Sequence, residues 1–310
     1  MLDKNNITVI IPCYNGSKYL EKSLPFLISY NVLIIDSSST DNTDSIVSNY
    51  DNVDIIRIDK ADFNHGSTRN LGLEYTTARI VVYLTQDAIP VDENSIFNLA
   101  KSICNNENTS VAYGRQIPHD NASIFGEFAR KFNYKKNSEL RQKSDAEKYG
   151  IKTIFNSNSF AAYEKDVLIE VGGFPSNVIL SEDTFVAAKM LDLGYKIAYN
   201  AEAKIKHSHN YTIMQEFRRY FDIGVFYGKE KWIKSEYSSA EGEGLKFIKS
   251  EMSYILSKKK IHLIPFSFIR NIMKYLGYRL GVNETIIPIR LKRRISMHNF
   301  YWKNERVTEN

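Results

Sequence analysis

Four acidic residues stand where a carboxylate could do chemistry. Asp36 and Asp87 each follow an apolar run, and Glu182 and Asp183 follow Ser181 at a predicted helix start. A carboxylate can take a proton from an attacking hydroxyl, and its oxygens are the ligands that hard divalent cations prefer. These four residues are therefore candidates for acid–base chemistry or for ligand binding. The ordinary alternatives are a turn residue at Asp36, a helix cap at Asp87 and dipole-stabilised acids at the helix start.

Histidine and arginine side chains could complete such a site. His207 and His209 alternate after a predicted strand at Ala203–Lys206, so they share one face if the strand continues. His65 and Arg69 lie four residues apart around another predicted helix start, where free N–H groups and a forked cation favour a phosphate. We interpret these four residues as candidate ligands for a metal or an anionic substrate. The alternatives are ordinary polar histidines and a surface ion pair.

The first half of the chain alternates apolar runs with segments of helical spacing. It predicts strands at Ile7–Pro12, Val32–Asp36, Val53–Ile58 and Ile80–Thr85, and helices at Ser17–Ser29, Asn42–Tyr50 and Ser67–Thr77. Such alternation predicts an α/β fold with a mainly parallel sheet that is covered on both faces. Ligands of these sheets lie beyond the carboxyl ends of the strands, where Asp36 and Asp87 stand.

The second half is more mixed. It predicts a strand at Ser110–Pro118, helices at Asn121–Lys136, Lys165–Val171 and from Glu182 to about Leu193, and a strand at Ala203–Lys206. We expect Ser181 to cap the helix that carries the two acids, because serine is a preferred residue at that position.

Several protein classes lack the motifs that they need. The turn Pro12–Ser17 lacks the glycines of a dinucleotide-binding fold, and no phosphate-binding Gly-Lys-Ser/Thr loop occurs. Cys13 and Cys104 make no disulfide framework, which favours a reducing compartment and structural roles for both. The amino terminus does not have the pattern of a signal peptide, and no apolar window has the length of a transmembrane helix. We therefore expect a soluble or peripheral protein.

The motifs at the predicted strand ends resemble those of family 2 inverting glycosyltransferases. The resemblance covers roughly residues 7–230 and rests on pieces that occur in the family's order: Val9–Asn15, Asp36–Thr43, Phe63–Asn70, Thr85–Pro90, Gly172–Pro175 with Glu182-Asp183, and His207–His209. The third and fourth pieces resemble the bacterial rhamnosyltransferase branch, which uses dTDP-L-rhamnose. The resemblance implies a GT-A fold with a helical C-terminal extension. It also implies transfer of a sugar to a hydroxyl of a saccharide or lipid-linked saccharide in surface polysaccharide biosynthesis.

The same resemblance implies a role for each matching residue. The nucleotide-sugar donor would contact Pro12, Tyr14, Asp36, His65, Arg69, Gln86 and Asp87. A divalent cation, Mg²⁺ or Mn²⁺, would bind Asp87, His207 and His209. Asp183 would be the general base, with Glu182 beside it. Relatives often have a second acid where this chain has Gln86, so metal dependence is left open.

The C-terminal region differs in charge from the rest of the chain. Residues 244–310 hold 14 Lys and Arg against 4 Asp and Glu, a net +10, while the other residues carry a net −5. We expect a GT-A domain at residues 1–240, with a nucleotide-sugar half to about 118 and an acceptor half from about 119, and a basic amphipathic helical region at 241–310.

Basic residues interleaved with aromatic and aliphatic ones predict contact between this region and an anionic membrane surface. The clearest basic run is Arg290, Lys292, Arg293 and Arg294. We therefore expect a cytoplasmic protein that is peripheral at the inner face of the cell membrane, with no nucleic-acid partner. A helical subdomain packed on the core is the alternative for this region.

Two other functions are compatible with the same motifs. One is a GT-A enzyme that uses a UDP-hexose donor, and the other is a catalytically silent module that binds sugar-nucleotide or glycan. The presence of Asp87, Asp183 and both histidines argues against the silent module, because binding alone does not need them all.

Overall fold

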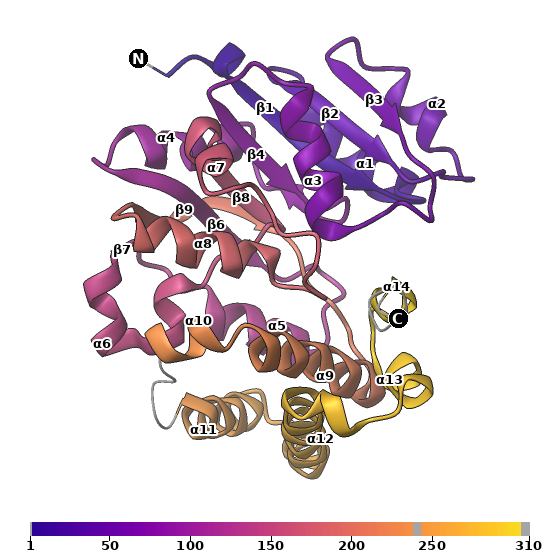
Figure 1. The fold of residues 1–310 in the computed structure, drawn as a ribbon, viewed down its shortest axis with the longest axis vertical. Coiled ribbons are helices and arrows are strands. Elements are labelled where there is room, and N and C mark those ends of the chain that lie inside the picture. Colours follow the sequence, from indigo (N-terminus) through magenta and orange to yellow (C-terminus); the bar gives the residue numbers. More distant parts are fainter. Residues whose placement is uncertain (1, 238–242, 305–310) are drawn as a thin grey trace.

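A computed structural model of the chain describes residues 2–237 and 243–304. Its centre is a nine-stranded sheet in the order β3-β2-β1-β4-β8-β6-β9-β5, with β7 paired to β9 (Figure 1). The strands are β1 (Ile7–Cys13), β2 (Asn31–Asp36), β3 (Val53–Arg57), β4 (Ile80–Leu84), β5 (Ile89–Pro90), β6 (Thr109–Ile117), β7 (Glu139–Arg141), β8 (Phe160–Glu164) and β9 (Lys196–Lys206).

Most of these strands share one direction. β1 to β4 are mutually parallel, and β6 and β9 run the same way because β8 is antiparallel to both β4 and β6. The short strands β5 and β7 run against β9. The α/β fold with a mainly parallel sheet is therefore confirmed. The carboxyl ends of β1, β2 and β4 meet at one edge of the sheet and bring their loops together.

Both faces of the sheet are buried, which explains the near-continuous apolar runs. One face packs Ile10, Ile35 and Tyr83 against α3 (His65–Glu74), α7 (Lys165–Glu170) and α8 (Glu182–Asp192), the helix that carries the two acids. The other face packs alternate residues such as Val9 and Ile34 against α1 (Ser17–Ser23), α2 (Thr43–Val47) and α4 (Ser95–Cys104). Because side chains of a strand alternate between faces, each strand contributes to both cores.

The helices around the sheet have these bounds: α1 (Ser17–Ser23), α2 (Thr43–Val47), α3 (His65–Glu74), α4 (Ser95–Cys104), α5 (Ile124–Asn133), α6 (Ala146–Tyr149), α7 (Lys165–Glu170), α8 (Glu182–Asp192), α9 (Ile213–Lys229) and α10 (Lys231–Glu236). The C-terminal helices are α11 (Glu243–Ser257), α12 (Ile264–Val282), α13 (Ile289–Ile295) and α14 (Tyr301–Asn304).

Several predicted elements have different bounds for physical reasons. The helix predicted at Ser17–Ser29 ends at Ser23 and continues as a short 3₁₀ turn, Leu24–Phe26, which contains Pro25. The last predicted strand begins at Lys196 instead of Ala203, because its first half pairs with β6 before a register shift at Gly114 and Arg115. The sequence reading missed β8, which separates β4 from β6.

The C-terminal helices are held against α9 by a close helix crossing. Gly224 of α9 faces the carbonyl of Tyr278, and Gly281 of α12 faces the carbonyl of Phe221. A Cβ on Gly281 would stand 2.0 Å from that oxygen, so only glycine allows α12 to lie this close to α9. None of the described helices has both the length and the apolarity needed to cross a membrane.

After α12 the chain turns back toward the sheet. α13 and α14 rise beside α9 toward the end of the molecule that carries α3 (Figure 1). The buried Asp222 of α9 holds this return by accepting hydrogen bonds from the backbone N–H groups of Met297, at 2.9 Å, and His298, at 3.0 Å. Trp302 is fully buried beside Phe221. The predicted domain boundary at 240/241 lies outside the described residues.

Candidate active site

The two acids predicted to be catalytic begin α8. Ser181, the residue before them, has a left-handed backbone with φ of 64°, a strained conformation for a residue with a Cβ. Ser181 is the N-cap residue, as predicted, but its side chain makes no capping hydrogen bond. The acids themselves occupy the first turn, where the helix dipole favours negative charge.

Glu182 is buried and ion-paired. Its Oε1 lies 3.0 Å from Nη1 of Arg69, a buried residue of α3, and 3.3 Å from the side-chain amide nitrogen of Asn158. Burial opposes ionisation, but the charges of Arg69 and His65 outweigh it and lower the pKa of Glu182. Arg69 was predicted to contact the donor; here it holds Glu182, and its donor role stays a prediction.

Asp183 has the opposite environment. Its carboxylate accepts hydrogen bonds from the backbone N–H of Asn158, at 3.0 Å, and of Thr184, at 2.7 Å. Burial and the neighbouring charge of Glu182 raise the pKa of Asp183 to about 6. Two adjacent acids whose pKa values are driven apart are typical of an acid–base site, in which the one with the raised pKa exchanges the proton.

The three predicted metal ligands come together. Oδ2 of Asp87 lies 3.4 Å from Nε2 of His207 and 3.7 Å from Nδ1 of His209. One ligand atom from each residue lies within 4.8 Å of the other two, a spacing that a single cation can bridge. The loop after β4 supplies the carboxylate, and the segment after β9 supplies both imidazoles.

The protonation of these residues suits a cation. The Gln116 amide oxygen accepts from Arg130, which can only donate, and it lies 2.8 Å from Nδ1 of His207. Nδ1 of His207 therefore donates to Gln116, and Nε2 is the nitrogen that faces Asp87. Burial and His207 lower the pKa of His209 to about 3, so His209 is neutral at pH 7. Burial would raise the pKa of Asp87, but His207 and His209 lower it below its usual range.

The cation ligands and the acids share one supporting segment. The Gln116 side-chain nitrogen donates to the hydroxyl of Ser157, at 3.0 Å, and the next residue, Asn158, binds both Glu182 and Asp183. The turn before β8 therefore fixes the two groups relative to each other. The sequence reading did not identify Gln116 or Asn158 as parts of the site, because neither stands in a motif that it recognised.

The predicted nucleotide residues lie at the ends of β1, β2 and β4. Pro12 is the last residue but one of β1, and Tyr14 is 38% exposed, with Nζ of Lys60 4.1 Å from the centre of its ring. The carboxylate of Asp36 is buried and accepts from the backbone N–H and hydroxyl of Ser39. Only Tyr14 of this group presents a free surface on which a base could stack.

Gln86 makes two hydrogen bonds that an acidic residue at this position could not both make. Its amide oxygen accepts from the backbone N–H of Tyr14, at 2.7 Å, and its amide nitrogen donates to the carbonyl of Tyr14, at 3.1 Å. A carboxylate can accept but not donate when ionised, so it could make only the first of these bonds. Gln86 therefore fixes the Tyr14 turn beside Asp87.

The motifs Phe63–Asn70 and Gly172–Pro175 contact each other at α3. The Asn70 side chain exchanges hydrogen bonds with the backbone of Phe174, each at 2.8 Å, and Asn64 donates to the carbonyl of Ser176. A Cβ on Gly66 would stand 2.1 Å from the carbonyl oxygen of Pro175, so this approach requires glycine. The motif at Gly172–Pro175 thus holds the helix that carries His65 and Arg69.

Further residues that the sequence reading missed lie near the site. Burial lowers the pKa of both His65 and His209, and the charge of Arg219, an exposed residue of α9, acts in the same direction. The ring of His298 meets that of His65 edge-on at 5.1 Å. No motif connects these residues with the acids; the fold brings them there.

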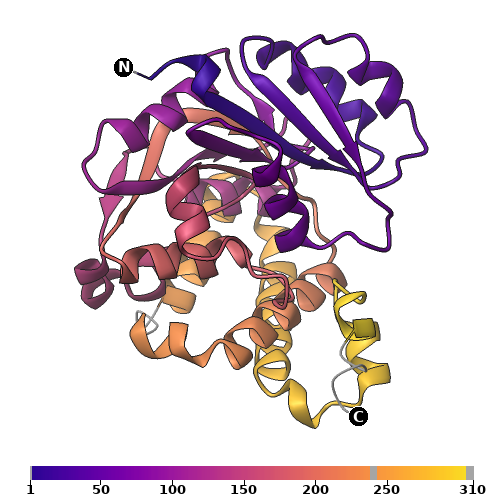
Figure 2. The same ribbon diagram turned by 45° about the horizontal axis from the view of Figure 1, so that its top comes forward.

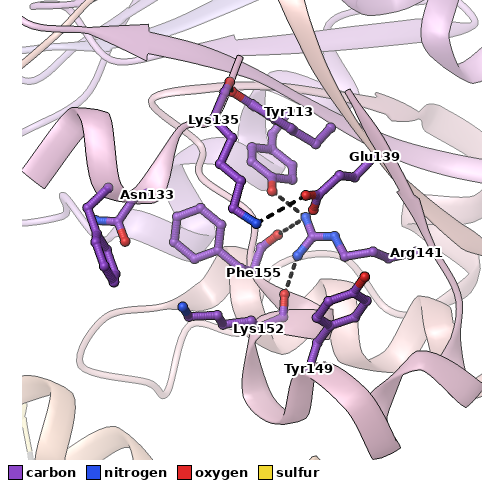
Figure 3. Close-up of a pocket in the computed structure, with 10 residues that line it drawn as sticks. Tyr113, Asn133, Lys135, Glu139, Arg141, Tyr149, Lys152 and Phe155 are labelled. Carbon is purple, nitrogen blue, oxygen red and sulfur yellow. Dashed lines mark hydrogen bonds and ion pairs between the residues drawn. The ribbon is translucent and has the colours of Figure 1, made fainter. Parts of the chain in front are cut away.

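A separate small pocket lies outside this site. It has a volume of about 90 Å³, and none of the predicted site residues lines it. Arg141 fills its wall and donates to the hydroxyl of Tyr113 and to the carbonyls of Lys152 and Phe155 (Figure 3). These contacts tie β7 to the segment before β8, which is a structural role.

Comparison with known proteins agrees with this geometry. The O-antigen chain rhamnosyltransferase RfbN of Salmonella typhimurium is 44% identical over 304 residues, and the match covers 96% of this chain and 96% of that protein. The O-antigen chain rhamnosyltransferase WbaN of Salmonella anatum is 44% identical over 306 residues, with the same coverage of both chains.

A solved structure shows the same fold at lower identity. The mannosyltransferase PcManGT of Pyrobaculum calidifontis, in complex with GDP-Man and Mn²⁺, matches with a TM-score of 0.59 at 16% identity, over 99% of this chain and 88% of that one. The predicted GT-A fold is thereby confirmed. A model of the family described as glycosyl transferase family 2 matches residues 8–172. Together with the relatives that share 44% of its residues, this match shows that the chain belongs to glycosyl transferase family 2.

Proposed function

We propose that this glycosyltransferase transfers L-rhamnose from dTDP-L-rhamnose to a hydroxyl of a lipid-linked saccharide during O-antigen synthesis. The observation that carries the reaction type is the acid pair, in which Asp183 has a raised pKa and Glu182 is neutralised by Arg69. The choice of sugar is supported by the names of two relatives that share 44% of their residues with this chain over 96% of its length.

In this proposal Asp183 is the general base. Asp183 is partly exposed as a residue, whereas Glu182 is buried, so Asp183 is the acid that an acceptor hydroxyl would reach. Asp183 would take the proton while the acceptor oxygen attacks the anomeric carbon opposite the departing nucleotide, which inverts the configuration. The hydrogen bonds from Asn158 and Thr184 fix the direction in which the carboxylate points.

The donor would lie between the Tyr14 turn and the two acids. Tyr14 would stack on the base, Asp36 would face it from the end of β2, and Gln86 would hold the Tyr14 turn in place. Asp87, His207 and His209 would hold a divalent cation. When bound, such a cation neutralises the charge that grows on the diphosphate as the glycosidic bond breaks.

The donor assignment predicts a preference that calorimetry can measure. We expect dTDP-L-rhamnose to bind more tightly than UDP-glucose or UDP-N-acetylglucosamine, because the branch-specific motifs at Phe63–Asn70 and Thr85–Pro90 belong to the donor side of the site. dTDP and UDP alone serve as controls that separate recognition of the base from recognition of the sugar. A clear preference for a UDP-hexose would contradict the rhamnose assignment but not the fold. Binding without any turnover, in the presence of acceptor extract, would favour the silent module.

We also propose that the chain works at an anionic membrane surface, through α12. Six apolar side chains of α12 are each at least 40% exposed: Phe268, Ile269, Ile272, Tyr275, Leu276 and Leu280. Exposed Lys259, Lys260 and Arg279 flank them. An apolar groove of about 710 Å³, lined by Met214, Leu263 and Phe266 among others, opens beside the start of this helix. This apolar and basic surface suits shallow insertion among anionic headgroups.

The basic run that the sequence pointed to is only half available for lipid. Lys292 pairs with Glu284, and Arg293 donates to the carbonyl of Trp302, whereas Arg290 and Arg294 are exposed. The membrane proposal therefore rests more on α12 than on this run.

Vesicle sedimentation tests the membrane proposal. We expect the double substitution Ile272→Glu with Leu276→Glu to reduce binding to anionic vesicles at least about tenfold, because each change replaces roughly 1 kcal/mol of apolar burial with a charge that the surface repels. Ile28→Glu, at an apolar residue that is 59% exposed in the first half of the chain, is the matched control. Equal recovery of all variants in the supernatant, with anionic and neutral lipid, would mean that this face has another use.

A further inference from the structure

The C-terminal segment reaches the neighbourhood of the acids. His298 and Phe300, between α13 and α14, meet two rings of the Phe63–Asn70 motif. His298 lies 5.1 Å from His65, and Phe300 lies 6.5 Å from both Phe63 and His65. His298 and Phe300 are 5.8 Å apart. We call these four residues, Phe63, His65, His298 and Phe300, the aromatic wall.

Buried residues around the aromatic wall hold its backbone in place. The carboxylate of Asp222 is fully buried and receives both backbone N–H groups at Met297 and His298. Ser296, just before the His298–Phe300 part of the wall in sequence, and Trp302, just after it, are both buried. In the other part of the wall, between Phe63 and His65, Asn64 caps α3 by accepting hydrogen bonds from the N–H groups of Gly66 and Ser67. Both halves of the wall are thus fixed before any ligand binds.

The wall stands next to the catalytic pair. Nη1 of Arg69 donates to the carbonyl of His65, at 2.8 Å, and the same nitrogen lies 3.0 Å from Glu182. The charge of Glu182, the residue just before Asp183, acts on both His65 and His298, so the wall lies near the start of α8. All four residues of the wall are partly exposed.

We propose that the aromatic wall binds the apolar C–H face of a pyranose ring, and that His298 and Phe300 are substrate-contacting residues contributed by the C-terminal segment. Binding sites for small ligands combine aromatic walls with a few aimed polar groups, and here Asp183 supplies such a group. This inference rests on the proposed function, since it takes a sugar as the ligand. The ring could belong to the donor sugar or to the acceptor.

Steady-state kinetics with Phe300→Leu and Phe300→Tyr tests the wall. Leucine keeps apolar volume but removes the ring, so we expect the KM of one substrate to rise about five- to tenfold, the value of one lost aromatic stack. Tyrosine keeps the ring and should restore the wild-type KM. Tyr75→Leu, at an exposed tyrosine beyond the other end of α3, is the matched control and should change neither constant.

Calorimetry without acceptor identifies which sugar is bound. Weaker binding of the nucleotide-sugar to Phe300→Leu, with unchanged binding of the nucleoside diphosphate, assigns the wall to the donor sugar. A change confined to the KM of the acceptor assigns it to the acceptor. The pair His298→Leu and His298→Phe repeats the comparison if Phe300→Leu does not fold.

If the wild-type protein is active and both Phe300→Leu and His298→Leu have normal KM values, the proposal that the wall binds a sugar is overturned, and the proposed function still stands. A rise in KM that tyrosine does not reverse would mean that residue 300 acts through packing alone, and would overturn it too. A wild-type protein that turns over no nucleotide-sugar would contradict the proposed function, and the wall would lose its ligand with it.

Discussion

Replacing Asp183 with asparagine is expected to lower the rate of sugar transfer by roughly two to four orders of magnitude, the usual contribution of a general base. Donor binding should change little, because the residues proposed to bind the nucleotide lie at the ends of β1, β2 and β4. The amide keeps the hydrogen bond from Asn158 or Thr184 but cannot take a proton. Initial rates with acceptor, and calorimetry of the donor alone, measure the two effects separately.

The pH dependence of kcat/KM is a second test of the role of Asp183. Because the pKa of Asp183 is raised to about 6, the base form prevails above that pH and is lost below it. We expect kcat/KM to be level above about pH 6 and to fall about tenfold per pH unit below it. Burial also raises the pKa of Asp222 to about 6, so Asp222→Asn must be measured beside it. The acid limb should persist in Asp222→Asn if Asp183 causes it.

Loss of activity in Asp183→Asn should not come from unfolding. A carboxyl group whose pKa is raised on folding binds its proton more tightly in the folded state, so the charged form lowers stability as pH rises through about 6. Asparagine has no charge at any pH, and we expect a Tm at pH 7 that is no lower than that of the wild type. Asp166→Asn, in the exposed first turn of α7, is the control. An Asp183→Asn protein that kept most of its transfer rate would refute the assignment.

The parallel half of the fold could be predicted from the sequence because most of its strands are buried on both faces. β1, β2 and β4 are nearly continuous apolar runs, and the edge strand β3 has three apolar residues, so the positions of all four were predicted to within about two residues. β8 was missed because Phe160–Glu164 is short and directly precedes a helix. Its place between β4 and β6 depends on long-range pairing, which local pattern does not encode.

Some residues of the candidate site could also be predicted from the sequence, and others could not. Asp87, His207 and His209 come together as predicted, because the loop after β4 and the segment after β9 meet near one edge of the sheet. The partners that tune these residues could not be predicted. Gln116, Asn158 and Arg219 reach the site from three different elements, and nothing in their own segments marks them. The aromatic wall needs a chain return of more than 200 residues, from Phe63 to Phe300.

A second large effect is expected at Asp87. Its Oδ2 is the atom that faces both His207, at 3.4 Å, and His209, at 3.7 Å, so removing its charge removes the only anionic ligand of the cluster Asp87–His207–His209. We expect Asp87→Asn to weaken the binding of Mn²⁺ by more than about tenfold and to lower transfer at least as much. Calorimetric titration of Mn²⁺ into chelator-treated protein, with and without nucleoside diphosphate, measures the first effect without relying on activity.

Asp120→Asn is the matched control for charge. Asp120 pairs with Lys206, just before the two histidines, and its side chain is 88% exposed. If both variants lost Mn²⁺ equally, the effect would be one of general electrostatics. If Asp87→Asn bound Mn²⁺ as the wild type does, the cation site would lie elsewhere.

The composition of this cluster also predicts which cation binds better. Gln86 uses its amide on the backbone of Tyr14, so Asp87 alone contributes a carboxylate and two imidazoles supply the other ligands. Mg²⁺ prefers oxygen ligands and strict octahedral geometry, whereas Mn²⁺ accepts nitrogen ligands such as imidazole more readily. We therefore expect Mn²⁺ to bind more tightly than Mg²⁺, and the difference to shrink in a His209→Asp variant, which replaces one imidazole with a second carboxylate. Equal affinities in the wild type would mean that the imidazoles are not ligands.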